Sequence, residues 1–348
     1  MQTADHSIAE SPDRPVTRLA PSPTGALHLG NARTFLINWA MAVRRGWRVV
    51  MRVEDLDTPR VKAGAEASAL RDLRWLGLTW DGMDRPGQGV TRQRDELSPY
   101  RDALLRLHER GLIYPCSLTR REVAEASASA PQATFGPGVI DRSKHEQRYP
   151  GTSRDADASD TGDLLEPSDR CWRVRVPDGA RVVRDGFMGE VSVDVQAEVG
   201  DFIVASKAGL PAYQLAVVVD DRRQGVTEVV RGDDLIGSAA RQGWLWAMLG
   251  HEGEPNWWHL PLVLGEDGHR LAKRHGDTRV GWFAERGVSA ERVVGLLAWW
   301  SGVVEEPMAM SAAEFAGAFT LDALPREPAV MDDRAWRWLG VSPEEAKP

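Results

Sequence analysis

The distribution of hydrophobic and polar positions in the first third of the chain predicts alternating strands and helices. Apolar runs at 16–20 and 48–53 are typical of short buried strands, and each ends in a break rich in proline, glycine or acidic residues. Apolar residues recur at helical spacing in three segments, at about 32–45, 62–77 and 98–113. This alternation is typical of a parallel sheet covered by helices.

The same alternation resumes after residue 200. We predict a buried strand over 211–221, because its apolar residues run on without a helical period. The remaining predicted elements are a strand over 226–231, a helix over 235–249, a strand over 258–264 and largely helical structure over 278–340.

The middle of the chain has a different composition. Residues 124–170 are rich in Ala, Ser, Asp and Gly and hold few large apolar side chains, so we expect a long, partly mobile surface segment. Residues 171–200 alternate apolar and polar positions, which indicates a small β-rich insertion.

The predicted fold class is therefore α/β, with a doubly wound parallel sheet, a small α+β insertion and a helical C-terminal part. The expected divisions are a flexible tail over 1–13, the two halves of the sheet domain over 14–113 and 201–265, the insertion over 114–200, and a loop followed by helices over 266–348.

Composition narrows the class of protein. The 348 residues carry a net charge of −8, and 42% are apolar, which is ordinary for a soluble globular protein and excludes disorder of the whole chain. The acidic balance excludes a protein that coats nucleic acid by charge alone, but it leaves room for a local basic groove. Two cysteines are too few for a disulfide framework. With no leader-like or membrane-spanning apolar run, we expect a cytoplasmic protein.

The first motif that carries chemistry is PSPTGALHLGN, residues 21–31, where the first strand turns into the first helix. A helix N-terminus presents free N–H groups and attracts phosphate. His28 can donate to a phosphate oxygen, and Gly30 leaves space for a flat base against the backbone. Taken alone, such a segment is more often a proline-rich turn with a chance histidine.

The second motif is GHRLAKRHG, residues 268–276, which follows the last apolar strand. A mobile loop carrying Arg270, Lys273 and Arg274 could close over a polyphosphate and stabilise the charge that develops as pyrophosphate leaves. Taken alone, a short basic run is more often a solvated loop.

The two motifs together resemble the signatures of class I aminoacyl-tRNA synthetases, HLGN the HIGH motif and RLAKR the KMSKS motif. RLAPSPTGALHLGNART, RVEDLDTPR and QGVTEVVRGDDL are similar to the glutamyl-tRNA synthetase branch. The resemblance covers about residues 16–280 and implies a Rossmann-like catalytic domain that uses ATP with Mg²⁺. It implies a catalytic set of His28, Gly30, Asn31, Arg270 and Lys273, with ATP held by His28, Gly30 and Lys273. In the loop, Arg270 replaces the first Lys and Ala272 the Ser, so we expect Lys273 to be the catalytic cation.

A glutamate pocket needs cations for the side-chain carboxylate, an anion for the ammonium and hydroxyl groups for orientation. Arg18 and Arg231 end two predicted strands and Glu54 ends another, while Ser22 and Tyr213 offer hydroxyls. The resemblance implies that the two arginines and the tyrosine hold the γ-carboxylate, and that the serine and the glutamate hold the ammonium. Without the resemblance, each has an ordinary alternative as a surface or core residue.

A zinc site that short members of this family often carry, of the form Cys-x-Cys and Tyr-x3-Cys, is incomplete here. Cys116 and Tyr149 stand at two of its positions, but Leu118 and Ser153 replace the other two ligands. Leucine has no lone pair and a neutral hydroxyl is a poor zinc ligand, so we expect no zinc. We expect Cys171 to be a core cysteine.

Only about seventy residues follow the second motif, too few for the anticodon-binding body of a full-length glutamyl-tRNA synthetase. This short architecture resembles the glutamyl-queuosine tRNA(Asp) synthetase family. The resemblance implies transfer of glutamate to queuosine in the anticodon of tRNA(Asp), with the anticodon stem-loop held by the catalytic domain. We expect a monomer. Candidate phosphate contacts are Arg120, Arg121, Arg173 and Arg175.

Two other functions stay open. The chain could be a glutamyl-tRNA synthetase that charges the tRNA 3′ end without an anticodon domain. It could also be a non-catalytic paralogue that binds nucleotide or RNA, given the altered loop and the incomplete zinc site.

Overall fold

The computed structural model describes residues 14–85, 88–128, 148–156, 158, 163–271 and 275–346. The predicted tail over 1–13 and much of the predicted mobile segment over 124–170 lie outside these residues, so both stay predictions.

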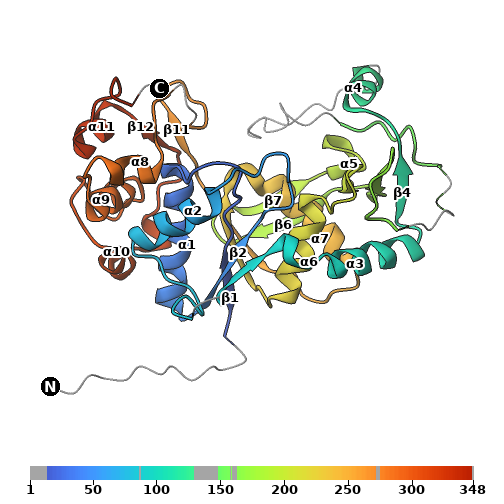
Figure 1. Cartoon of the computed structure of the whole chain (residues 1–348), viewed down its shortest axis with the longest axis horizontal. Coiled ribbons are helices and arrows are strands. Elements are labelled where there is room, and N and C mark those ends of the chain that lie inside the picture. Colours follow the sequence, from blue (N-terminus) through green and yellow to red (C-terminus); the bar gives the residue numbers. More distant parts are fainter. Residues whose placement is uncertain are drawn as a thin grey trace.

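A seven-stranded sheet forms the centre of the fold, in the order β3-β2-β1-β9-β10-β6-β7 (Figure 1). Its strands are β1 (Val16–Leu19), β2 (Arg48–Val53), β3 (Val90–Arg92), β6 (Arg181–Asp185), β7 (Gly189–Val193), β9 (Glu228–Gly232) and β10 (Asn256–Leu260). Neighbouring strands are parallel, except for the β6–β7 hairpin. The strand order reverses between β1 and β9, and in open α/β sheets ligands bind at the carboxyl ends of the strands beside such a switch point.

Helices cover both faces of this sheet. On one face lies α1 (Leu29–Arg45), which contacts β1, β2 and β9 and ends at Gly46, whose φ of 67° suits the left-handed residue that closes a helix. On the other face a second apolar core joins the sheet to α3 (Ser98–Glu109), α6 (Tyr213–Arg223) and α7 (Ile236–Met248). This two-sided cover confirms the predicted doubly wound α/β fold.

A separate three-stranded antiparallel sheet is formed by β4 (Ile113–Cys116), β5 (Cys171–Val174) and β8 (Ile203–Ala205), with α4 (Arg120–Ala128) following β4. The strands divide differently from the expected insertion over 114–200. The β6–β7 hairpin extends the main sheet, because β6 pairs with β10, whereas β8 belongs to the small sheet. The short helix α5 (Val195–Glu198) links the two.

The predicted strand over 211–221 is wrong, because this segment forms most of helix α6. The helix is buried on all sides from Gln214 to Asp221, against α3, α7 and β8. A helix that is buried on all sides has no amphipathic period, so a short buried helix and a buried strand give the same pattern.

The predicted single strand over 258–264 is also wrong. After β10 the chain breaks at Pro261, and β11 (Val263–Gly265) pairs instead with β12 (Ala329–Met331) in a two-stranded sheet. Proline has no N–H for a ladder hydrogen bond, so it marks the change of sheet.

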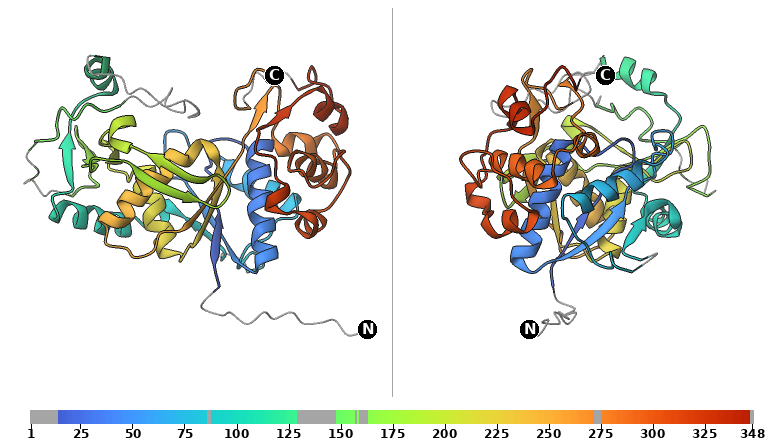
Figure 2. Two further views of the ribbon diagram at one scale, coloured as in Figure 1. Left: turned by 180° about the vertical axis from the view of Figure 1, so that it is seen from behind. Right: turned by 60° about the vertical axis from the view of Figure 1, so that its left-hand side comes forward.

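The C-terminal part is largely helical, as predicted, with β12 as the exception. It contains α8 (Val280–Glu285), α9 (Ala290–Trp300), α10 (Ala312–Ala318) and α11 (Asp333–Leu339), and α2 (Ala65–Trp75) contacts α8. These helices lie beside α1, at the opposite end of the molecule from β4 and α4 (Figure 2). No helix among the described residues has the length and apolar character to cross a bilayer.

Candidate active site

Two backbone hydrogen bonds fasten the turn after β1 to the segment after β2. The Glu54 amide donates to the Pro21 carbonyl oxygen at 3.1 Å, and the Lys62 amide donates to the Pro23 carbonyl oxygen at 3.0 Å. Ser22, between the two prolines, is exposed. Because β1 and β2 are adjacent parallel strands, Ser22 and Glu54 lie together at the carboxyl edge of the sheet.

Beneath this edge lies a buried ionic network. Arg52, fully buried in β2, donates to Asp221 at 2.6 Å and to Glu54 at 3.2 Å. Arg18 in β1 donates from Nη1 to the Val230 carbonyl oxygen at 3.3 Å, and its Nε lies 3.4 Å from the same Asp221 oxygen. Burial raises the pKa of Glu54, and the charges of Arg52 and Arg18 oppose that rise. Each ion is therefore paired, as buried charges require.

Tyr213 and Arg231 approach the same edge from the other side of the switch point. Arg231 is buried near the end of β9, and Tyr213 is the first residue of α6. Burial raises the pKa of the Tyr213 hydroxyl, and the charges of Glu54, Arg231 and Arg18 all act on it. These four groups therefore lie near enough to one another for their charges to interact.

The structure thus brings together the residues expected to form a glutamate pocket. Two guanidinium groups, a carboxylate and a phenol converge there, and the exposed Ser22 lies beside Glu54 through the backbone link. Cations opposite an anion suit a zwitterion with a second carboxylate. The individual roles of these residues in binding stay proposals.

His28 joins the first motif to the segment that follows the second. Its Nδ1 lies 3.1 Å from the Thr278 hydroxyl, and the Leu29 amide donates to the Thr278 carbonyl oxygen at 3.0 Å. Burial lowers the pKa of His28 and outweighs the charge of Asp277, which raises it. A neutral imidazole at the start of α1 leaves the positive end of the helix to attract phosphate.

Gly30 and Asn31 lie in the first turn of α1, where backbone N–H groups have no helical partner. Asn31 is exposed. A Cβ at Gly30 would meet Val263 at 3.6 Å, an ordinary contact, so the surrounding protein does not itself demand glycine there. The space that Gly30 leaves for a base stays a prediction.

The second motif begins in a tight turn after β11. Arg270 pairs across this turn with Leu264, and its Nη1 lies 2.5 Å from a carboxylate oxygen of Asp234, just after β9. The predicted catalytic cation Lys273, with Ala272 and Arg274, lies outside the described residues. Beyond the loop, the Asp277 amide donates to the Ala346 carbonyl oxygen at 2.7 Å.

The four positions of the expected incomplete zinc site lie close together in the small sheet. The Cys116 sulfur is 3.6 Å from the hydroxyl oxygens of Tyr149 and Ser153, and Leu118 packs against the same cluster. Cys171 faces Cys116 across the strand pair and donates to its carbonyl oxygen at 3.2 Å. Within the described residues, no three His, Cys, Asp or Glu side chains are grouped to hold a metal ion. The absence of zinc stays a prediction.

The candidate RNA contacts in the small sheet differ in their surroundings. Arg173 is buried, donates to the Asp201 carbonyl oxygen at 2.7 Å and lies over the Tyr149 ring, so it stabilises the fold and is not free to meet a phosphate. Arg175 donates to the Gly111 carbonyl oxygen at 3.1 Å. Arg121 is exposed on α4 beside Glu125.

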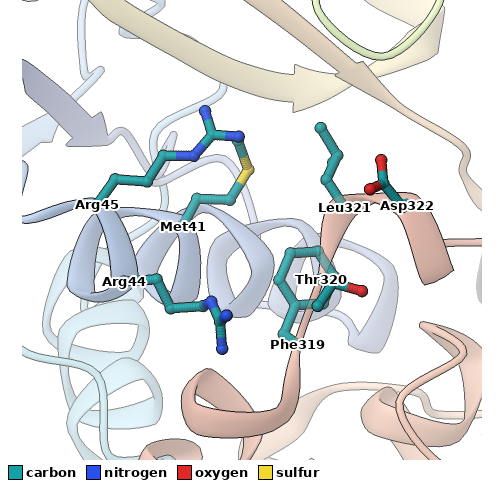
Figure 3. A pocket seen from close by; sticks show the side chains of 7 residues that line it. All are labelled: Met41, Arg44, Arg45, Phe319, Thr320, Leu321 and Asp322. Atoms are coloured by element: carbon teal, nitrogen blue, oxygen red, sulfur yellow. The ribbon is translucent and has the colours of Figure 1, made fainter.

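A hollow of about 380 Å³ lies away from this site, at the C-terminal end of α1 (Figure 3). It is lined by Met41, Arg44, Arg45 and residues 319–322. His28 precedes the N-terminal end of α1. The hollow and His28 are therefore separated by the length of the helix, about 25 Å.

Sequence reasoning missed the buried groups behind the pocket, namely Arg52, Asp221, Asp185, His259 and Gln242. A charged or imidazole side chain inside an apolar strand, as in RVVMRV and WHLPLVL, is the one signal that could have found some of them, because such groups are rarely buried without a partner.

Comparison with known proteins shows which family this chain resembles. The family model described as tRNA synthetases class I (E and Q), catalytic domain, matches residues 15–338. A glutamyl-Q tRNA(Asp) synthetase of Rhodopirellula baltica is 43% identical over 333 residues, which cover 91% of this chain and 97% of that protein. A protein of the same name from Symbiobacterium thermophilum is 43% identical over 317 residues, which cover 89% and 94%.

Glutamate–tRNA ligase 2 of Syntrophus aciditrophicus is 36% identical over 330 residues, but these cover only 65% of that longer protein. Among solved structures, a glutamate tRNA ligase from Elizabethkingia meningosepticum, in complex with its amino acid, aligns with a TM-score of 0.74 and 24% identity. The alignment covers 94% of this chain and 69% of that one, and it shows a shared fold.

Proposed function

The chain belongs to the class I tRNA synthetases of the glutamate and glutamine type, and we propose that it activates glutamate with ATP and transfers it to queuosine in the anticodon of tRNA(Asp). It is therefore a ligase of the aminoacyl-tRNA synthetase kind. Its substrates under this proposal are glutamate, ATP with Mg²⁺, and the tRNA.

One observation carries the proposal, the convergence of Arg18, Glu54, Tyr213 and Arg231 at the switch point of the sheet. The arginines and the phenol receive the γ-carboxylate, while Glu54 and Ser22 receive the ammonium. The α-carboxylate is left to point toward the start of α1, where ATP is held by His28 and the first turn of the helix.

Activation then follows from alignment. An oxygen of the glutamate α-carboxylate attacks the α-phosphorus of ATP, and the bond to pyrophosphate breaks. The resulting adenylate keeps glutamate in place while a hydroxyl of the RNA attacks the acyl carbon and AMP leaves. Lys273 neutralises the charge that develops on the phosphate during the first step.

The choice of acceptor is supported by the two relatives named glutamyl-Q tRNA(Asp) synthetase, which this chain matches over 97% and 94% of their lengths. It is also supported by the charge of −8, because a stem-loop offers fewer phosphates than a whole tRNA and needs no extended basic surface. The alternative acceptor is the 3′ end of a tRNA, as the name glutamate–tRNA ligase of a more distant relative would imply.

ATP–pyrophosphate exchange in the absence of tRNA tests the activation step. We expect exchange with glutamate and none with glutamine, which has the same shape but lacks the second carboxylate. No exchange at high enzyme concentration would overturn the proposal and favour a protein that only binds nucleotide or RNA.

A further inference from the structure

Arg231, the pocket arginine on β9, is held by a chain of buried side chains that runs across the sheet. Its register partner on the neighbouring strand β10 is His259, and the next strand, β6, contributes Asp185. The Arg231 Nε donates to the His259 Nε2 at 3.0 Å, and the His259 Nδ1 lies 2.6 Å from the Asp185 carboxylate. The side chains of His259 and Asp185 have no exposed surface at all.

In this series of buried side chains, Asp185 acts only as a hydrogen-bond acceptor. One of its oxygens accepts the amides of Phe187 and Met188, at 2.9 and 2.7 Å. The other accepts the backbone amide of His259 at 3.0 Å as well as its ring nitrogen. Because the Arg231 Nε–H points at Nε2 of His259, that nitrogen accepts with its lone pair, and the proton of the imidazole lies on Nδ1, beside the Asp185 carboxylate.

Gln242 fixes a second side of the same guanidinium. The Arg231 Nη1 donates to its amide oxygen at 2.8 Å, and its amide nitrogen donates to Gln214 at 3.0 Å. Gln214 in turn donates to the Ser238 hydroxyl at 3.0 Å. This series sets which way the Gln242 amide points, with its oxygen toward Arg231.

The remaining hydrogens of Arg231 define what it can bind. A guanidinium has five N–H groups. Three of them have partners among the described residues, at His259, Gln242 and the Leu235 carbonyl oxygen, which leaves one on each Nη. Two N–H groups on neighbouring nitrogens suit the two oxygens of a carboxylate, but they do not suit an amide, whose nitrogen is itself a donor.

We propose that Asp185 and His259 are positioning residues, which orient Arg231 so that its two remaining N–H groups face the side-chain carboxylate of the substrate. The inference rests on the proposed function for the identity of that carboxylate. His259 does not touch the substrate and acts through Arg231, as a neutral acceptor that uses the Nε–H and adds no second cation.

Substitution of His259 tests this role. His259→Leu removes the acceptor, leaves the Arg231 Nε–H unpaired in a buried place and is expected to raise the KM for glutamate about tenfold or more in ATP–pyrophosphate exchange. The KM for ATP stays unchanged. His259→Gln, whose amide oxygen can accept from Nε, restores most of the affinity. The proposal would be overturned if His259→Leu and His259→Gln raised the KM for glutamate by the same factor, and if each raised the KM for ATP by that factor as well.

Asp185→Asn gives an independent test, because it changes which nitrogen of the His259 ring carries the proton. An amide nitrogen turned toward His259 makes the Nδ1 an acceptor and moves the ring proton to Nε2, where it faces the Arg231 Nε–H. We expect the glutamate KM to rise as in His259→Leu. Adding His259→Leu to Arg231→Lys should cost little beyond Arg231→Lys alone, because both act through one contact. Additive losses would contradict the positioning role.

A measurement without catalysis separates this proposal from the proposed function. If the unaltered protein shows no glutamate-dependent exchange, the proposed function fails. Nuclear magnetic resonance then reports on the positioning by itself, through the solvent exchange of the Arg231 Nε–H. We expect slow exchange in the unaltered protein and in His259→Gln, and fast exchange in His259→Leu. Equal rates in all three would overturn the proposal.

Discussion

The Nδ1 atom of His28 lies 3.1 Å from the hydroxyl oxygen of Thr278, although 250 positions separate the two residues in the sequence. The contact joins the start of α1 to the segment just beyond the basic loop. Backbone hydrogen bonds on both sides of it, from Leu29 to Thr278 and from Val280 to Leu27, hold the two segments in register. The segment that follows the basic loop is therefore held against the residue that is expected to meet ATP.

Thr278→Val removes this hydroxyl and keeps the shape of the side chain. We expect kcat for ATP–pyrophosphate exchange to fall about fivefold, the loss of one neutral hydrogen bond that orients His28. Thr79→Val is the matched control, because the Thr79 hydroxyl accepts from Trp39 and not from the site. Equal kcat values in the two variants would show that the His28–Thr278 contact has no role in activation.

Lys273→Ala tests the loop assignment. We expect adenylate formation to fall about 100- to 1,000-fold, because the variant loses a cation aimed at developing charge. Glutamate binding, measured by calorimetry, should persist. Lys207→Ala changes a lysine that follows β8 and donates to the Ser117 carbonyl oxygen, and it should leave exchange intact. Exchange near the parent rate in Lys273→Ala would refute the assignment.

His259 also makes stability depend on pH. Burial lowers its pKa from 6.5 to about 4, and the charge of Arg231 adds to this, against the raising effects of Asp185 and the Leu235 carbonyl. In this range the unfolded chain takes up a proton that the folded chain excludes, so stability is lost as pH falls from 6.5 to about 4. We expect this to lower the free energy of unfolding by up to about 3 kcal/mol, as measured by urea titration. In His259→Gln this part of the loss should be absent, so its free energy of unfolding should fall less over the same pH range. Identical dependence of the free energy of unfolding on pH in the two proteins would exclude the effect.

Metal analysis of the purified protein tests the incomplete zinc site. We expect no stoichiometric zinc, because Leu118 and Ser153 supply no thiolate. A variant with both Leu118→Cys and Ser153→Cys restores the ligand types around Cys116 and Tyr149, and it should bind zinc. Stoichiometric zinc in the unaltered protein would contradict the prediction.

The elements around the switch point could be predicted because their signals are local. The apolar run of β1, the helical spacing of α1 and the break at Gly46 agree with the final structure within a few residues. The candidate pocket residues follow from the same logic, because parallel strands present their ends at one edge. Helix α6 could not be predicted, because burial on all sides erases its period.

The groups that hold the pocket in shape depend on contacts across the sheet that no local pattern encodes. Arg52 meets Asp221 over 169 positions, and His259 meets Asp185 over 74. The pairing of β6 with β10 brings Asp185 into place, and the sequence pattern assigned that hairpin to the insertion. A sheet edge can be inferred from single strands, whereas its supporting hydrogen bonds require the strand order.

The acceptor of glutamate is the central claim, and mapping the labelled nucleotide tests it most directly. Queuosine-containing tRNA(Asp) is incubated with the enzyme, ATP and radiolabelled glutamate, then digested with nuclease and separated. We predict label on the anticodon fragment that contains queuosine, and none when the tRNA carries guanosine at that position. Label on the terminal adenosine would contradict the account and identify a synthetase that charges the 3′ end.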